Sequence, residues 1–210
     1  MKPRKITKSR VKQIYSFYSH KTGEKFLVES GLEYDACFNF EYDPEIEGFE
    51  PQPLGFRYKE FGRVSFYTPD FLLYYASAKR KKYVEIKIKK DTEDSVFQDL
   101  FECKKSRANE LGFDLEYMTE ETIRREPFLS NLKLLDYYHS KNPLDDVDYH
   151  ILEKMERCKE ARIIDILDIL AQDETTFLPK IYNLVAKKML SINISNSNLN
   201  VQSLISPINK

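Results

Sequence analysis

Two periodicities run through the first 140 residues of the chain. Hydrophobic and polar positions alternate around Lys21-Thr22-Gly23-Glu24 and again over 82–89, which is the two-residue period of β-strands. Elsewhere apolar residues recur every three or four positions, which is the period of a helix packed on one side. Prolines and glycines crowd the stretch 43–64, which indicates a loop interrupted by short extended pieces.

These patterns predict one order of elements. The predicted elements are a hairpin over 14–29, a helix over 31–41, strands over 66–75 and 82–89, a helix over 94–111 ending at Gly112, a strand over 113–117, a short helix after Thr119 and a helix over 129–139. Strands interspersed with helices predict a mixed α/β domain, in which helices flank one central sheet.

The last third of the chain has a different pattern. Pro143 and Asp145-Asp146 mark a boundary, so we expect one domain over residues 1–140 and a second over residues 141–210. The elements predicted for the second domain are helices near 146–158, 161–171 and 177–190 and a hairpin that pairs 192–194 with 199–201. Three helices followed by a hairpin predict a small winged-helix domain.

Composition narrows the class of protein. Of the 210 residues, 41% are hydrophobic, which is enough for a folded core. No run approaches the ~20 apolar residues that a membrane-spanning helix needs. The three cysteines lie far apart and the three histidines do not cluster, so neither a zinc site nor a disulfide framework is indicated, and a reducing cytoplasm is expected. No GxxxxGK loop is present, which argues against an NTPase.

The formal net charge of -1 is no signature of nucleic-acid binding, but the charges are unevenly distributed. The first 13 residues include six basic and no acidic side chains, among them Lys5, Lys8 and Arg10. Such an arm can lie along phosphates, although a solvated tail explains it equally well. Acidic and basic residues nearly balance after residue 140, so we expect the second domain to contact protein rather than to read DNA.

Two short motifs bring acidic and basic side chains onto neighbouring predicted strands. Thr68-Pro69-Asp70 and Glu85-Ile86-Lys87 are separated by 14 residues. A turn centred near residue 78 would place Asp70 opposite Lys87. Strand alternation sorts the second strand into two faces, with Glu85, Lys87 and Lys89 on one and Val84, Ile86 and Ile88 on the other, toward the core. A slip of one residue in this register would break the arrangement.

This arrangement fits metal-dependent hydrolysis of a phosphodiester. One or two Mg²⁺ ions, for which Mn²⁺ is expected to substitute, prefer hard oxygen ligands. Asp70, Glu85 and the backbone carbonyl of Ile86 are the candidate ligands, and Lys87 is the candidate that orients or helps to deprotonate the attacking water. The alternative is a solvated strand edge, which the occurrence of both motifs on adjacent strands disfavours.

Glu33 is a further candidate ligand, on the helix that precedes these strands. Ser30-x-x-Glu33 is also a capping box, in which Glu33 bonds back to the backbone of Ser30 and needs no metal. On spacing alone, the cap is the better interpretation.

Taken in order, several motifs of the chain resemble the TnsA endonuclease family. The segments that carry the resemblance are Tyr18–Gly23, Glu29–Glu33, Gln52-Pro53, Thr68–Leu72, Glu85–Lys87, Thr119–Ile123 and Asn131-Leu132. The resemblance implies a restriction-endonuclease-like PD-(D/E)xK core followed by a winged helix. It maps the family's catalytic set onto Glu33, Asp70 and Lys87, with Glu85 at the variable first position of the ExK triplet. It therefore favours Glu33 as a metal ligand as well as a helix-start residue.

The resemblance also implies a role in cut-and-paste transposition. TnsA proteins cut the 5′ ends of the element, while the DDE recombinase TnsB cuts and joins the 3′ ends, and the C-terminal domain of TnsA is associated with the regulatory ATPase TnsC. The implied partners are transposon-end DNA, TnsB and TnsC. The chain is short for the family and resembles the compact versions of CRISPR-associated transposons.

Two other classes of protein stay open at the level of the sequence. One is a stand-alone restriction-type or junction-resolving nuclease, and the other is a catalytically silent scaffold of the same fold that binds DNA or protein. The candidate DNA contacts are Lys5, Lys8, Arg10 and Lys89.

Overall fold

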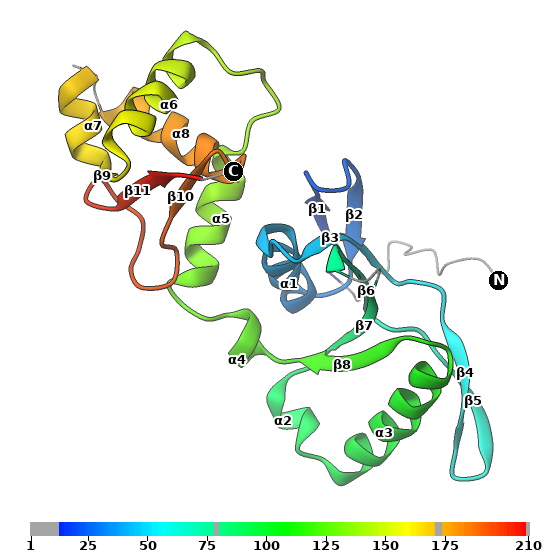
Figure 1. The fold of residues 1–210 in the computed structure, drawn as a ribbon. Coiled ribbons are helices and arrows are strands. Elements are labelled where there is room, and N and C mark those ends of the chain that lie inside the picture. Colours follow the sequence, from blue (N-terminus) through cyan, green and yellow to red (C-terminus); the bar gives the residue numbers. More distant parts are fainter. Residues whose placement is uncertain (1–12, 78–79, 171–173, 209–210) are drawn as a thin grey trace. The chain divides into compact units, whose positions relative to one another are not determined.

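The chain forms two compact units. The computed structural model describes residues 13–77, 80–170 and 174–208 (Figure 1). The first unit is Met1–Arg125 and the second is Glu126–Lys210.

Helix α5 (Phe128–Tyr138) belongs to the second unit, where it packs against α8 (Glu174–Ala186). The structure therefore divides the chain earlier than the boundary expected between residues 140 and 141. Pro143 lies in a connection within the second unit, and this connection ends at Asp145, the N-cap of the next helix.

A four-stranded sheet is the centre of the first unit (Figure 1). Its strands, in spatial order, are β3 (Ile46–Pro51), β6 (Phe71–Tyr75), β7 (Lys81–Ile86) and β8 (Asp114–Met118). The first three run antiparallel and the last two run parallel. A parallel pair needs a crossover, and α2 (Lys89–Thr92) and α3 (Ser95–Glu110) provide it. The predicted mixed α/β architecture is confirmed.

The N-terminal elements of the first unit also form as predicted. They are the hairpin of β1 (Tyr15–Tyr18) and β2 (Lys25–Val28), and helix α1 (Gly31–Tyr42). Buried aromatic rings join these elements to the sheet. Phe17 meets Phe38 of α1 with ring centroids 5.1 Å apart, and Phe40 of α1 meets Phe71 of β6 at the same distance. Helix α1 is thereby fixed against the strands that carry the candidate site.

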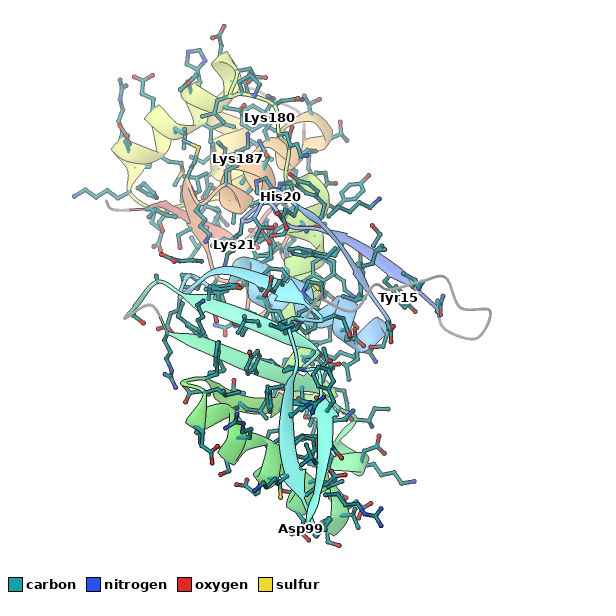
Figure 2. All side chains as sticks on the ribbon, turned by 90° about the vertical axis from the view of Figure 1, so that its right-hand side faces the viewer. Tyr15, His20, Lys21, Asp99, Lys180 and Lys187 are labelled. Carbon is teal, nitrogen blue, oxygen red and sulfur yellow. The ribbon has the colours of Figure 1, made fainter. Side chains whose placement is uncertain are left out.

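Lys21, labelled in Figure 2, ties the β1–β2 turn to the end of α1. Its ammonium donates hydrogen bonds to the carbonyls of Phe40, Asp43 and Ile46 at 2.8, 2.5 and 2.6 Å. Its backbone N–H donates to the buried carboxylate of Glu41 at 2.9 Å. Because the carbonyls at the end of a helix have no partner within the helix, Lys21 stabilises both the helix end and the hairpin.

The strand predicted over 66–75 is two strands in the structure. β5 (Arg63–Tyr67) pairs with β4 (Phe56–Glu60), whereas β6 pairs with β3 and β7, so the chain changes partners at Thr68-Pro69-Asp70. Proline has no N–H for a ladder and restricts the residue before it, which accounts for the break. Much of the predicted loop over 43–64 is accordingly strand.

Helices surround a small sheet in the second unit. After α5, its elements are α6 (Asp146–Cys158), β9 (Ala161–Arg162), α7 (Ile163–Leu170), α8, β10 (Leu190–Ile192) and β11 (Leu204–Pro207). The short helix α4 (Glu120–Ile123) precedes α5 and belongs to the first unit. β11 lies between β10 and β9, and both pairings are antiparallel. The expected pairing of 192–194 with 199–201 is wrong, because β10 pairs with residues 205–207.

Asn131 of α5 holds the loop that separates β10 from β11. Its amide group donates to the carbonyls of Ile194 and Ser197 at 2.9 and 2.8 Å and accepts from the N–H of Leu199 at 3.0 Å. Asn131 is only 2% exposed. These three bonds from one buried side chain explain why the loop does not form the tight hairpin that the sequence suggested.

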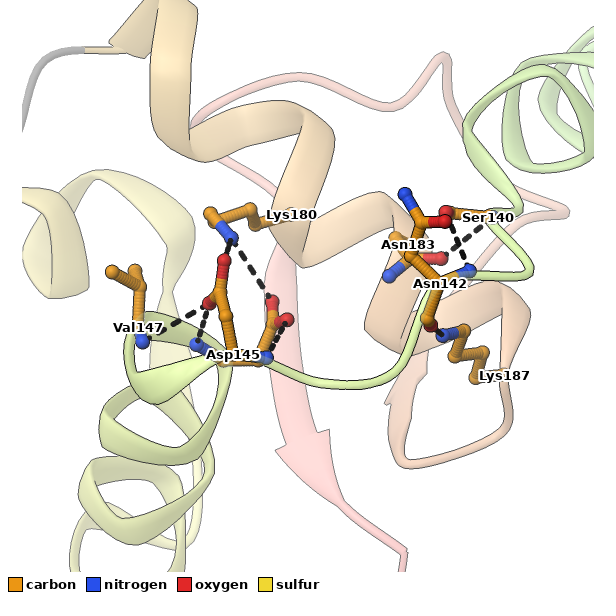
Figure 3. A network of polar contacts seen from close by, with 8 residues as sticks. Ser140, Asn142, Asp145, Val147, Lys180, Asn183 and Lys187 are labelled. Atoms are coloured by element: carbon orange, nitrogen blue, oxygen red, sulfur yellow. Dashed lines mark hydrogen bonds and ion pairs between the residues drawn. The ribbon is translucent and has the colours of Figure 1, made fainter.

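Lys180 ties the start of α6 to α8 (Figure 3). Its ammonium lies 2.5 Å from a carboxylate oxygen of Asp145 and 3.7 Å from one of Asp148. Asp145 also caps α6 by accepting from the N–H groups of Val147 and Asp148. Asp145, the first acidic residue after Pro143, therefore both caps α6 and connects it to α8.

None of the helices in the described part of the chain is both long enough and apolar enough to cross a membrane.

Candidate active site

Asp70 lies at the entrance of β6, where it is held by a backbone contact. Its carboxylate accepts a hydrogen bond of 2.7 Å from the N–H of Ile86 at the end of β7. Since Phe71 pairs with Val84, the next position places Asp70 beside Glu85, not opposite Lys87 as predicted. The prediction was wrong by two residues, because the turn closes with the N–H of Tyr75 on the carbonyl of Arg80. A shift of two residues leaves the faces of the strands unchanged.

Glu85 is the most enclosed acidic group of the site, at 5% exposure. Tyr67 donates a short hydrogen bond from its phenol to one carboxylate oxygen of Glu85, and the ammonium of Lys87 lies 3.0 Å from the other. The structure therefore brings together Asp70, Glu85 and Lys87, the three residues that the two motifs predicted.

The environment raises the pKa of both Asp70 and Lys87, for different reasons. Burial and then the negative charge of Glu85 raise the pKa of Asp70, and the charge of Glu33 adds to the effect, while the N–H of Ile86 opposes it. Burial alone would lower the pKa of Lys87, but Glu85 outweighs it and holds that pKa above its ordinary value. Lys87 is therefore a cation at neutral pH.

Beyond Ile86 the chain departs from the predicted strand. The N–H of Lys87 still donates to the carbonyl of Met118 at 3.0 Å, but Ile88 is 55% exposed and does not point to the core. Lys89 begins α2 and forms an ion pair of 2.7 Å with Glu121. Lys89 therefore does not continue the face of Glu85 and Lys87. The strand ends early because β8, its parallel neighbour, ends at Met118.

The three other candidate DNA contacts, Lys5, Lys8 and Arg10, lie outside the described residues.

Glu33 takes part in the cap of α1. Its carboxylate accepts from the hydroxyl of Ser30 at 2.9 Å and from the N–H of Glu29 at 3.1 Å, and its own N–H donates to the Ser30 hydroxyl at 3.1 Å. The cap is thus confirmed, although Glu33 reaches the side chain of Ser30 and not its backbone. The effect of Glu33 on the pKa of Asp70 shows that its charge is felt in the same site.

The donor set suits a hard divalent cation. Asp70, Glu85 and Glu33 are carboxylates, which Mg²⁺ prefers, and burial followed by the charge of Glu85 raises the pKa of Asp70, an environment in which a bound cation would favour the ionised carboxylate. Among the described residues, no three Asp, Glu, His or Cys side chains stand close enough together to form a ready-made metal site. Glu33 is the carboxylate engaged elsewhere, in the helix cap.

Two residues of the site were not among the predicted site residues. Tyr67 hydrogen-bonds Glu85, and its only signal in the sequence is its place three residues before Asp70. Gln52 follows β3 with a left-handed φ of +50°, is 7% exposed and donates its N–H to the carbonyl of Asp70 at 2.8 Å. A non-glycine residue in that conformation is uncommon, and here it fixes the backbone of Asp70.

A mixed sheet that carries two carboxylates and a lysine at the adjoining ends of its central strands suits an α/β domain of the nuclease type. Residues 43–120 match the family model described as TnsA-like endonuclease N terminal. The chain thus carries a TnsA-like endonuclease domain, and the resemblance to the TnsA family is confirmed over this segment, which contains Asp70, Glu85 and Lys87. A comparison with curated proteins finds no match.

Proposed function

We propose that the protein is a Mg²⁺-dependent DNA endonuclease that hydrolyses the 5′ (non-transferred) strands at transposon ends, acting with a DDE recombinase. The observation that carries this proposal is the meeting of Asp70, Glu85 and Lys87 within the segment that matches the TnsA-like domain. A carboxyl group whose pKa is raised by burial, beside a second carboxylate and a lysine, is typical of a catalytic centre.

Each residue has a role in this proposal. Asp70, Glu85 and the carbonyl of Ile86 would hold the metal ion. When bound, Mg²⁺ supplies Lewis acidity toward the scissile phosphate and lowers the pKa of a water. Lys87 remains protonated beside Glu85, so it orients the attacking water and offsets the charge that develops on the phosphate. Tyr67 holds the carboxylate of Glu85 in one orientation.

Glu33 is proposed as an additional ligand that leaves its cap when the ion binds. The bonds to Ser30 and Glu29 that it would give up are replaceable, since the start of α1 is only partly buried there and water can satisfy its first N–H groups.

The partners of the proposed reaction are transposon-end DNA, the recombinase TnsB and the ATPase TnsC. We propose that the second unit is a winged helix that contacts TnsC. The order α6, β9, α7, α8, β10, β11, with β11 paired to both other strands, supports that fold. The near balance of acidic and basic residues after residue 140 supports a protein partner over DNA.

Strand-specific cleavage tests this function. A duplex that contains the element end is incubated with Mg²⁺, the neighbouring recombinase and either wild type or Asp70→Asn. We expect 5′-strand cuts with wild type only and 3′-strand cuts with both. Cuts by the wild type without the recombinase would favour a stand-alone nuclease. Absence of 5′ cuts with all partners present would favour a silent scaffold.

Metal binding is measured separately from cleavage. Mg²⁺ should raise the melting temperature of the wild type by binding the folded state, and it should leave that of Asp70→Asn nearly unchanged. An equal rise in both proteins would show that Asp70 is not a ligand.

A further inference from the structure

The β4–β5 hairpin has one face buried and one face exposed. Phe56, Tyr58 and Tyr67 point inward and pack in a cluster with Phe101 of α3. Figure 1 shows the hairpin beside α3, at the edge of the first unit. The inward face therefore holds the hairpin against α3, and the outward face makes no contribution to this core cluster.

Cations line one strand of the outward face and apolar side chains line the other. In the register of the hairpin, Arg57 is opposite Phe66 and Lys59 is opposite Val64, and all four are exposed. Phe66 is 50% exposed and Val64 is 62% exposed. Neither Arg57 nor Lys59 takes part in an ion pair within the part of the chain that the structure describes.

Two of the acidic residues near these cations have partners of their own, and the exposed Glu102 of α3, which lines the same hollow as Arg57 and Lys59, forms no ion pair with either. Glu60, the acidic residue of the hairpin, accepts hydrogen bonds from Tyr58 and Ser65 on the opposite face. Glu110 of α3, which borders the hollow beside Arg57, is paired with Arg107 at 2.7 Å. The positive charge of Arg57 and Lys59 is thus available to an external anion.

The tip of the hairpin presents an aromatic ring at a strained position. Phe61 and Gly62 form its two-residue turn, with φ of +43° and +81°. Such turns favour asparagine or glycine at the first position, since a bulky side chain is disfavoured there. Phe61 is nevertheless 74% exposed. A strained aromatic residue that contributes nothing to the core suggests a use in binding.

The hairpin also leads directly into the candidate active site. β5 ends at Tyr67, whose phenol bonds Glu85, and Asp70 follows three residues later. The base of the hairpin therefore adjoins the candidate active site.

We propose that the outward face of the β4–β5 hairpin binds duplex DNA beside the bond that is cut, with Arg57 and Lys59 on backbone phosphates and Phe61 in a groove. The proposal rests on the proposed endonuclease function and adds the element that positions its substrate. Two-stranded β-ribbons fit the major groove of DNA, and many DNA-binding proteins insert apolar side chains between base pairs. A protein partner fits less well, because two buried cations would then need acidic partners.

The test measures binding of a short fluorescent DNA duplex by anisotropy over a range of salt concentrations, with EDTA present so that nothing is cut. Arg57→Ala with Lys59→Ala should weaken binding at least about tenfold at low salt and lower the slope of log K against log salt by about 2, near 0.9 for each lost phosphate contact. The matched control, Lys25→Ala with Lys81→Ala, removes two exposed cations elsewhere in the same unit and should leave the slope unchanged.

Phe61→Asn separates binding from folding. Asparagine suits the left-handed turn, so this variant should melt at a higher temperature than the wild type, yet it should bind the duplex several-fold more weakly. Loss of binding in a more stable protein is not a result of misfolding.

Each outcome decides the proposal. Equal affinity and slope for the hairpin variant and the control, or no duplex binding by the wild type at low salt, would overturn it. So would a hairpin variant that loses a protein partner but keeps DNA. Failure of the endonuclease function is recognised differently: the wild type would bind DNA through the hairpin and yet make no 5′ cut with all partners present.

Discussion

The phenol of Tyr67 donates a hydrogen bond to the carboxylate of Glu85, and this contact joins the end of the β4–β5 hairpin to the central sheet. The other oxygen of Glu85 faces Lys87 at 3.0 Å. One carboxylate is thus contacted on its two oxygens by Tyr67 at the end of β5 and by Lys87 just after β7.

Tyr67→Phe should lower the rate of 5′-strand cleavage by roughly 10–100-fold, because the groups that orient a metal ligand typically contribute that much. Burial and Glu85 raise the pKa of Tyr67, so the phenol remains a donor at all working pH values. Tyr58→Phe is the matched control, since its hydroxyl bonds Glu60 and not Glu85. Equal losses in the two variants would show that the effect is structural.

Asp70→Asn should abolish cleavage and stabilise the metal-free protein by an amount on the order of 1 kcal/mol that grows with pH. Burial and Glu85 raise the pKa of Asp70, so the folded state binds a proton that the unfolded state releases above pH ~4. The stability of the wild type should therefore fall as the pH rises from that value toward the raised pKa. Denaturant unfolding of both proteins in EDTA at several pH values measures this. A difference that shrinks as the pH rises would contradict the assigned environment.

Lys87→Ala should cut roughly 10²–10⁴-fold more slowly while binding Mg²⁺ with near wild-type affinity. The ammonium contributes charge and orientation to the reaction but no metal ligand. Single-turnover cleavage and a Mg²⁺ titration of the melting temperature separate the two effects. Loss of Mg²⁺ binding in this variant would show that the role of Lys87 is misassigned.

Glu33→Gln and Ser30→Ala separate the two roles of the start of α1. Glutamine still reaches the Ser30 hydroxyl and the Glu29 N–H, so Glu33→Gln should fold normally but cut more slowly if Glu33 is a ligand. Ser30→Ala should lose about 1 kcal/mol of stability and keep its activity. The free energy of unfolding and the cleavage rate are measured for both. Full activity in Glu33→Gln would leave Glu33 with the cap alone.

Asn131→Ala should lower the free energy of unfolding of the second unit by about 2–4 kcal/mol, because it leaves two carbonyls and one N–H of a loop without their partner. Asn193→Ala, an exposed change in the same loop, is the control and should have little effect. Thermal unfolding followed by circular dichroism measures both. A similar small effect in the two variants would contradict the role given to Asn131.

The elements that were predicted well have local signals. Helix α6 has the predicted bounds of 146–158, and α3 lies within the predicted 94–111, with Gly112 following at a φ of +83°. Capping side chains, helical periodicity and a glycine in the left-handed region act within a few residues, so they can be read from the chain.

The errors concern pairing between distant residues. The register of β6 on β7 and the pairing of β10 with 205–207 both depend on partners elsewhere in the chain. The role of Tyr67 has no local signal for the same reason, because its partner Glu85 is 18 residues away.

By itself the sequence determined the mixed α/β class and predicted that Asp70, Glu85 and Lys87 lie together, because short motifs on strands of known alternation restrict which side chains share a face. Only the tertiary structure decided that Asp70 lies beside Glu85, that Tyr67 orients Glu85 and that Arg57, Lys59 and Phe61 project from one hairpin. The physical reason is that strand register and burial are set by the sum of many distant contacts, none of which is visible in the local sequence.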